Sequence, residues 1–238
     1  MTTPEPPATA PVTPETAAPA APATTRTLIL SGGGAYRDPW HPFADTSRRL
    51  AEILAGLGHQ VEITEDVGDR VADLRGWDLV VANAADGPEA DIRPALAGLL
   101  KALDRGTGVL AVHVGACTLL RLRLWESVTG AAWVGGQSTH PPAGPARITI
   151  YPGRHVITEP VGDFDIVDER YAFLRTAPDV VPLAAHEYQG RVHPLLWARE
   201  RGPSRIVTDL LGHDARSFDC AQHRELISRA ARWVTRAL

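Results

Sequence analysis

Residues 107–117, with the sequence TGVLAVHVGAC, decide the fold. The stretch contains an apolar run without alternation, Val109 to Val112, which predicts a central parallel strand covered on both faces. The run ends at His113, and ligands of open α/β sheets bind outside the carboxyl ends of such strands. His113 is therefore a candidate site residue, although the ordinary interpretation of a lone histidine there is a hydrogen-bonded core residue. Gly115 permits a tight turn into the next segment.

Length, charge and composition limit the classes of function that this chain can have. A chain of 238 residues is long enough for one α/β domain with its own core. The net charge is −4 and no basic patch emerges, so we expect no nucleic-acid partner. The two cysteines, Cys117 and Cys220, form neither a disulfide framework nor a zinc-ribbon spacing. No apolar run approaches the roughly 20 residues of a membrane span, and no secretory signal is recognisable, so we expect a cytoplasmic enzyme without membrane contact.

The chain divides into a tail and one domain. Residues 1–25 are rich in Pro, Ala and Thr, with no large apolar residue beyond Val12, and are predicted to be a disordered tail. Residues 26–238 are predicted to form one domain. Its first part contains strands at 27–30, 60–64, 78–82 and 109–112, and helices at 43–57 and 94–103. Its second part contains strands at 133–136, 146–151, 164–174, 181–185, 194–198 and 205–208, then a helix at 222–238.

This order of elements predicts an α/β fold. Strands that alternate with helices form a parallel sheet with helices on both faces. The second half lacks helical periodicity and should extend the sheet with antiparallel strands or form a β-rich layer. The glycine loop at 31–34 does not match a dinucleotide fingerprint, because Arg37 stands where the third glycine is required. The loop instead displays Tyr36, Arg37 and His41 toward a ligand.

Six motifs in chain order resemble the trehalose-utilisation (ThuA-like) family. They are SGGGAYRDPWHPFADTS (31–47), VLAVHVGA (109–116), WVGGQSTHPP (133–142), HVIT with DFDIVDERY (155–158 and 163–171), HPLLW (193–197) and LGHDARSF (211–218). The resemblance covers residues 26–238. It implies a flavodoxin-like three-layer α/β sandwich related to class I glutamine amidotransferases.

The same resemblance argues against glutamine hydrolysis. Those amidotransferases carry a cysteine on a sharp turn after a central strand, and here His113 stands in the cysteine's place. An imidazole is a poor substitute for a thiolate nucleophile. Cys117 lies four residues too late to occupy the turn.

Histidines and one carboxylate form the candidate site. The candidate catalytic residues are His113, Glu169 and His213. The candidate substrate contacts are Tyr36, Arg37, His41, Trp133, His140, His193 and Asp214. The candidate metal ligands are His113, His140, His193 and His213. Such a set either binds a divalent metal such as zinc or manganese, or provides a general acid and base. Structural interpretations also stand: His140 could cap a turn, Glu169 could be solvated, and Asp214 fits a helix N-cap.

The resemblance implies a role in disaccharide catabolism, because the family is associated with sugar dehydrogenases that yield 3-keto-glycosides. We therefore expect a small carbohydrate as partner and an isomerase, lyase or hydrolase acting on a keto-sugar or glycoside. The hypothesis is abstraction of a proton next to a carbonyl by a histidine or Glu169. The alternative is a non-catalytic sugar-binding or regulatory module. A serine hydrolase ranks last because no G-x-S-x-G motif is present. Six tryptophans and the β-rich half could support a homodimer face.

Overall fold

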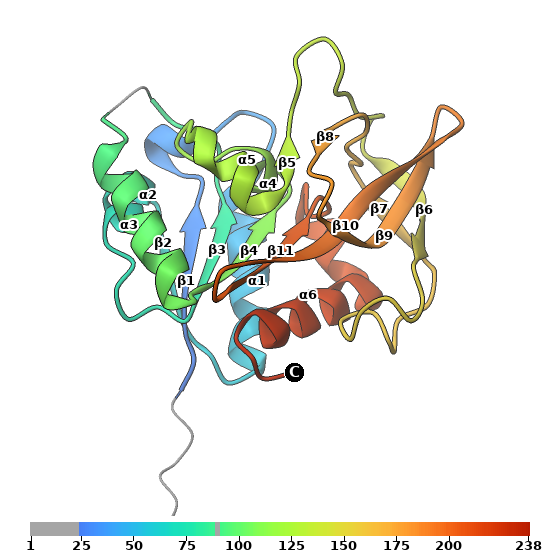
Figure 1. Cartoon of the computed structure of the whole chain (residues 1–238). Helices are drawn as coiled ribbons and strands as arrows, with labels where there is room; N and C mark the ends of the chain where they lie inside the picture. Colours follow the sequence, from blue (N-terminus) through green and yellow to red (C-terminus); the bar gives the residue numbers. More distant parts are fainter. Residues whose placement is uncertain (1–23, 89–90) are drawn as a thin grey trace, which may run out of the picture.

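The computed structural model describes residues 24–88 and 91–238 (Figure 1). The predicted disordered tail lies outside the described residues, except for Thr24 and Thr25. The strands are β1 Arg26–Ser31, β2 Gln60–Thr64, β3 Leu79–Asn83, β4 Gly108–Val112, β5 Ala131–Ala132, β6 Gly144–Ile150, β7 Phe164–Asp168, β8 Arg175–Thr176, β9 Val181–Tyr188, β10 Arg191–Arg201 and β11 Ser204–Asp209. The helices are α1 Phe43–Gly56, α2 Val67–Ala72, α3 Arg93–Arg105, α4 Val114–Cys117, α5 Arg123–Thr129 and α6 Ala221–Val234, with 3₁₀ helices η1 Gly34–Tyr36 and η2 Ala215–Asp219.

The central sheet confirms the predicted α/β fold. Its nine strands follow the order β2-β1-β3-β4-β11-β10-β9-β6-β7. The first five strands in this order pair in parallel, as in a flavodoxin-like sheet. The remaining strands pair antiparallel, so the second half of the chain extends the sheet as predicted.

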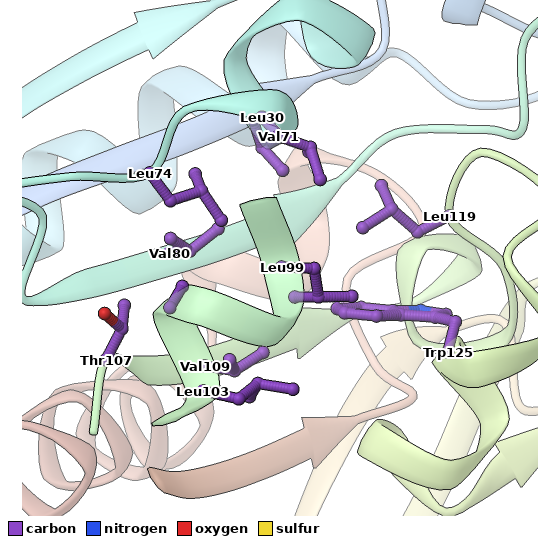
Figure 2. A pocket seen from close by; sticks show the side chains of 11 residues that line it. Leu30, Val71, Leu74, Val80, Leu99, Leu103, Thr107, Val109, Leu119 and Trp125 are labelled. Carbon is purple, nitrogen blue, oxygen red and sulfur yellow. The ribbon is translucent and has the colours of Figure 1, made fainter. Parts of the chain in front are cut away.

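Helices cover both faces of the parallel strands (Figure 1). Helix α6 packs against α1, β4 and β11 on one face, and α2 packs against α3 on the other. Continuous apolar runs produce this arrangement, because every residue of β3 and β4 is buried. Figure 2 shows the apolar core beside α3, where the remaining void is only about 10 Å³. The described helices include none that is long and apolar enough to cross a membrane.

The antiparallel half curls back toward the parallel half. Strand β7 lies four places from β11, a distance of roughly 19 Å in a flat sheet. Yet Asp168, the last residue of β7, accepts a hydrogen bond from the backbone N–H of Gly212 at 2.8 Å. Pairing directions also make β7 run the same way as β11, so both strands end at the same edge. The curl therefore brings the residue after β7 to the carboxyl ends of the parallel strands.

The strand predicted at 133–136 is absent, the one predicted at 164–174 is too long, and the one predicted at 194–198 is too short, because β10 covers 191–201. Residues 133–136 form a turn, in which Gly136 has φ +77° and the N–H of Ser138 donates to the carbonyl of Val134. The strand expected at 164–174 ends at Asp168, because the Asp168 side chain accepts the next backbone N–H, that of Glu169. Helix α2 was not predicted, and its six residues are too few for a clear periodicity.

Gly115 is needed for a reason other than the predicted tight turn. It lies inside α4, and a Cβ there would meet the carbonyl oxygen of Ala82 in β3 at 2.4 Å. The turn conformation falls on His113 instead, with φ +49°. Gly115 therefore allows α4 to pack directly on the backbone of β3.

Candidate functional site

His113 lies on a strained turn between β4 and α4. Its φ of +49° and ψ of −118° are unusual for a residue with a side chain. Its backbone N–H donates to the carbonyl of Asp209 at 2.7 Å, and its Nδ1–H donates to the carbonyl of Leu210 at 2.9 Å. These two bonds fix the ring and leave Nε2 free to face Glu169.

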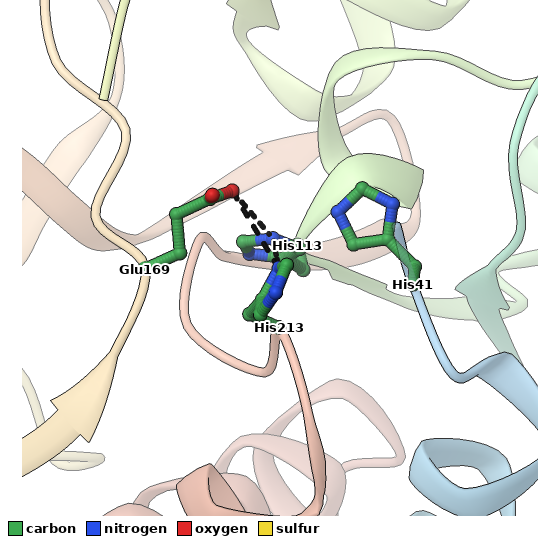
Figure 3. A group of neighbouring side chains, drawn as sticks. All are labelled: His41, His113, Glu169 and His213. Carbon is green, nitrogen blue, oxygen red and sulfur yellow. Dashed lines mark hydrogen bonds and ion pairs between the residues drawn. The ribbon is translucent and has the colours of Figure 1, made fainter. Parts of the chain in front are cut away.

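Glu169 joins three imidazoles. Its Oε2 lies 3.3 Å from His113 Nε2 and 3.6 Å from His213 Nδ1 (Figure 3). The same two nitrogens lie 3.3 Å from each other. The other oxygen, Oε1, lies 2.9 Å from Nδ1 of His140, whose side chain is 39% exposed. Glu169 therefore contacts the buried His113 and the half-buried His213 on one side and a more exposed histidine on the other.

His41 reaches the same point from the loop after β1 (Figure 3). Asp38 Oδ1 accepts the backbone N–H groups of Trp40 and His41 at 2.9 Å each, which shapes this loop. The Asp38 carboxylate also accepts Nδ1–H of His41 at 2.7 Å. Nε2 of His41 is buried and has no hydrogen-bond partner among the described residues. A buried imidazole nitrogen with a free lone pair needs an explanation, and coordination of a ligand by this nitrogen would provide one.

The four side chains have the arrangement of a metal site. One ligand atom from each of His41, His113, Glu169 and His213 lies within 4.8 Å of the other three. Tetrahedral zinc with bonds near 2.05 Å places its ligand atoms about 3.3 Å apart. Three of the six separations in this group are 3.3, 3.3 and 3.6 Å. The donor set therefore fits a small divalent ion without a change in fold.

The electrostatics of the group favour neutral imidazoles at His41 and His213 beside a charged Glu169 carboxylate. Burial and then the charge of His113 lower the pKa values of His41 and His213, despite the opposing effects of nearby carboxylates. Burial raises the pKa of Glu169, but the hydrogen bond and charge of His113, with the charge of His213, lower it below the usual value overall. A histidine must be neutral and a carboxylate must be charged to bind a metal, so these shifts in pKa favour metal binding.

A cavity of about 990 Å³ opens onto this group. Two tryptophans contribute to its wall, and their exposure is 72% for Trp40 and 42% for Trp133. Tyr171 also lines it, and burial raises its pKa, so the phenol stays protonated. Burial raises the pKa of the Cys117 thiol to about 12, so this thiol is unreactive. The other lining residues are Asp38, Pro39, His41, Asp86, Val114, Thr118, His140, Ala143, Glu169 and His213.

Four predicted site residues lie outside both the cavity wall and the converging group. Tyr36 packs beside the backbone of Gly87, and Arg37 is not among the lining residues. His193, a candidate metal ligand, instead accepts the backbone N–H of Phe173 on Nδ1. Asp214 caps η2, as the N-cap interpretation predicted, and pairs with Arg216.

Other residues of the site were missed or assigned differently from sequence. His140 contacts Glu169 but lies outside the group of converging ligand atoms, whereas His41, proposed as a substrate contact, belongs to it. Sequence reasoning did not identify Asp38, Trp40 or Tyr171. The pattern D-x-x-H at 38–41 was the available signal for Asp38, because that spacing lets the carboxylate reach the ring.

Comparisons with known proteins agree with this fold. A ThuA-like protein from Parabacteroides merdae superposes with a TM-score of 0.75 at 17% identity, covering 90% of each chain. Another from Bacteroides uniformis gives 0.72 at 16% identity, covering 91% of this chain and 94% of that one. A glutamine amidotransferase from Thermotoga maritima gives 0.53 at 10% identity, covering 90% and 99%, which supports the amidotransferase-like fold. No curated protein sequence matched the chain. The family described as trehalose utilisation matches residues 26–234, and the chain therefore belongs to the ThuA family.

Proposed function

We propose that the protein is a metal-dependent enzyme that processes a keto-sugar or related glycoside. The observation that carries the proposal is the convergence of His41, His113, Glu169 and His213 on one point. Simple acid–base catalysis needs one or two such groups, whereas four donor atoms around one point are typical of a metal centre.

The outer hydrogen bonds support the same conclusion. His41 donates Nδ1–H to Asp38, and His113 donates Nδ1–H to the carbonyl of Leu210. Metal-bound histidines usually have their second nitrogen held in this way, since the bond fixes the tautomer and the ring direction. When bound, the metal would act as a Lewis acid that polarises a carbonyl or hydroxyl oxygen of the substrate.

His140 is then the best placed general acid or base. Glu169 and the three histidines of the converging group are assigned to the metal, whereas His140 lies outside that group and lines the cavity with a side chain 39% exposed. Its Nδ1 lies 2.9 Å from Glu169 Oε1 and donates to the carbonyl of Pro141 at 3.1 Å, which holds the ring and leaves Nε2 to exchange a proton with the substrate. This assignment differs from the expectation from sequence, in which His113, Glu169 and His213 were the candidate catalytic residues.

The cavity wall supports a carbohydrate substrate. Trp40 and Trp133 present exposed indole faces, which pack on the apolar C–H faces of sugar rings. The protonated hydroxyl of Tyr171 can donate to a sugar oxygen. The family's description, trehalose utilisation, also supports a carbohydrate substrate.

Metal content tests this proposal directly. Wild type, His213→Ala and His193→Gln would be incubated with Zn²⁺ or Mn²⁺, desalted and analysed for metal. We expect stoichiometric metal in the wild type and its loss in His213→Ala, which lacks a proposed ligand. His193→Gln is the matched control and should retain the metal, because His193 lies outside the converging group.

A second measurement separates catalysis from binding. His140→Gln should retain the metal but turn over a 3-keto-glycoside at least 100-fold more slowly, the usual contribution of a general acid or base. A metal-free wild type with full turnover would favour acid–base chemistry alone. Metal binding without turnover of any keto-glycoside would favour a sugar-binding module.

A further inference from the structure

Four buried polar side chains form a network behind the candidate site. They are Asp168, Asp209, Ser217 and His223, each at most 2% exposed. None of them lines the cavity. Charged groups are rarely buried so completely unless they are paired, so the network requires a structural or functional reason.

The network runs as a chain of hydrogen bonds. Ser217 Oγ–H donates to Asp168 Oδ2 at 2.6 Å. His223 Nδ1 lies 2.9 Å from Ser217 Oγ, and His223 Nε2 lies 2.9 Å from Asp209 Oδ2. Burial lowers the pKa of His223, but the charge and hydrogen bond of Asp209 raise it above the usual value overall. The raised pKa favours the protonated form of His223, and its two ring nitrogens link Asp209 to Ser217 and, through Ser217, to Asp168.

Asp209, His223 and Ser217 have the composition of a hydrolase triad but not its chemistry. A nucleophilic serine must donate its proton to the histidine and face a substrate. Ser217 is fully buried and donates to Asp168 instead. The three residues therefore do not form a second active site.

Asp168 holds two segments of the candidate site together. Its Oδ1 accepts the backbone N–H of Glu169 at 2.8 Å and that of His213 at 3.1 Å. Its Oδ2 accepts the backbone N–H of Gly212 at 2.8 Å. One carboxylate thus fixes the main chain at two proposed ligands, which come from β7 and from the loop after β11.

Asp209 holds a third ligand from the other end of the network. Its Oδ1 accepts the backbone N–H of Leu211 at 3.0 Å, and its carbonyl accepts that of His113 at 2.7 Å. The carbonyl of Leu210, the residue between Asp209 and Leu211, accepts Nδ1–H of His113 and so orients its ring. In the loop that carries His213, the backbone N–H groups of Leu211, Gly212 and His213 therefore donate to the two linked carboxylates. The backbone N–H of Leu210 donates to the carbonyl of Leu195.

We propose that the Asp168–Ser217–His223–Asp209 network is a positioning device that sets the spacing of the ligand atoms of His113, Glu169 and His213. The proposal rests on the metal site of the proposed function. The network connects the curled β7 end to the β11 loop through the hydrogen bonds of Asp168 to the backbone of Gly212 and His213. Residues that orient metal ligands from behind typically change metal affinity 10- to 100-fold when altered.

Ser217→Ala tests the proposal because it removes only the hydroxyl that joins the two halves of the network. We expect about 10-fold weaker Zn²⁺ binding by competition titration and an altered absorption spectrum of the Co²⁺ form, which reports ligand geometry. In metal-free protein, amide hydrogen exchange at Gly212 and His213 should become faster. A purely structural serine would lower stability without moving these readouts.

Ser204→Ala is the matched control. Ser204 is also fully buried, and its hydroxyl donates to the carbonyls of Leu103 and Thr107 at the other end of β4. It should leave Zn²⁺ affinity, the Co²⁺ spectrum and exchange at Gly212 and His213 unchanged. Unchanged exchange in Ser217→Ala would overturn the positioning role. A wild type that binds neither ion, with exchange still faster in Ser217→Ala, would instead overturn the proposed function alone.

Discussion

His186 is a buried imidazole whose protonation the fold opposes. Burial is the main cause that lowers its pKa, to about 4, with smaller contributions from Arg170 and His193. Its Nε2 contacts the carbonyl of Tyr171 at 3.0 Å, while its Nδ1 is buried with no hydrogen-bond partner in residues 24–88 and 91–238. The unfolded chain binds a proton near pH 6.5, whereas the folded protein does so only near pH 4.

Stability should therefore fall as the pH is lowered from 6.5 to about 4, and His186 should cause part of that fall. In His186→Leu, urea unfolding should show a shallower decline of the unfolding free energy across this window. Groups common to both proteins cancel in the difference, and the lost hydrogen bond adds only a constant offset. Parallel curves for the two proteins would contradict the prediction.

Two residues of the site were predictable from sequence because each follows the end of a strand. His113 and His213 follow buried strands, and both belong to the converging group. His193 had a similar motif, but it lies in the part of β10 that extends past β11 and pairs only with β9. His223 and Asp168 were missed, because nothing in one sequence shows which polar residues a core will enclose.

At the scale of elements, α4 depends on close contact with β3. A Cβ at Gly115 would lie 2.4 Å from the carbonyl oxygen of Ala82, and a backbone atom cannot rotate away. Gly115→Ala should therefore lower the unfolding free energy by about 2 kcal/mol, the usual effect of overpacking. Chemical denaturation would measure this change.

Gly135→Ala is the matched control for this prediction. A Cβ added at Gly135 would meet no atom within 4 Å, and this glycine has no positive φ, so its variant should be nearly neutral. Equal stability of the two variants would show that α4 can move away from β3 at little cost.

The parallel half of the fold could be predicted from the sequence for a physical reason. Strands buried on both faces, such as β3 and β4, appear as unbroken apolar runs, and α1 shows its buried stripe as Leu50, Ile53 and Leu54. The antiparallel half was less readable because polar residues end its strands through side-chain bonds, as Asp168 does for β7. The curl of the sheet depends on contacts distant in sequence, so no local pattern could predict it.

At the scale of the whole molecule, the proposed metal would connect the two halves of the sheet. His41 and His113 follow β1 and β4 in the parallel half, whereas Glu169 follows β7 at the far edge. A ligand that binds only the folded state stabilises it by mass action, by about 2.7 kcal/mol at 100 times its dissociation constant. Zn²⁺ should therefore raise the melting temperature of the intact protein.

The rise should disappear in Glu169→Gln, because an amide lacks the charge that the ion requires while keeping the shape of the side chain. Glu159→Gln is the control, since Glu159 is exposed and lies outside the converging group, and it should retain the full rise. The melting temperatures of the wild type, Glu169→Gln and Glu159→Gln would be measured by thermal unfolding with and without Zn²⁺. An equal rise in Glu169→Gln would place the bound ion elsewhere. Loss of the rise in that variant alone would show that the carboxylate at the curled edge completes the site, and that the extension of the sheet serves to deliver it.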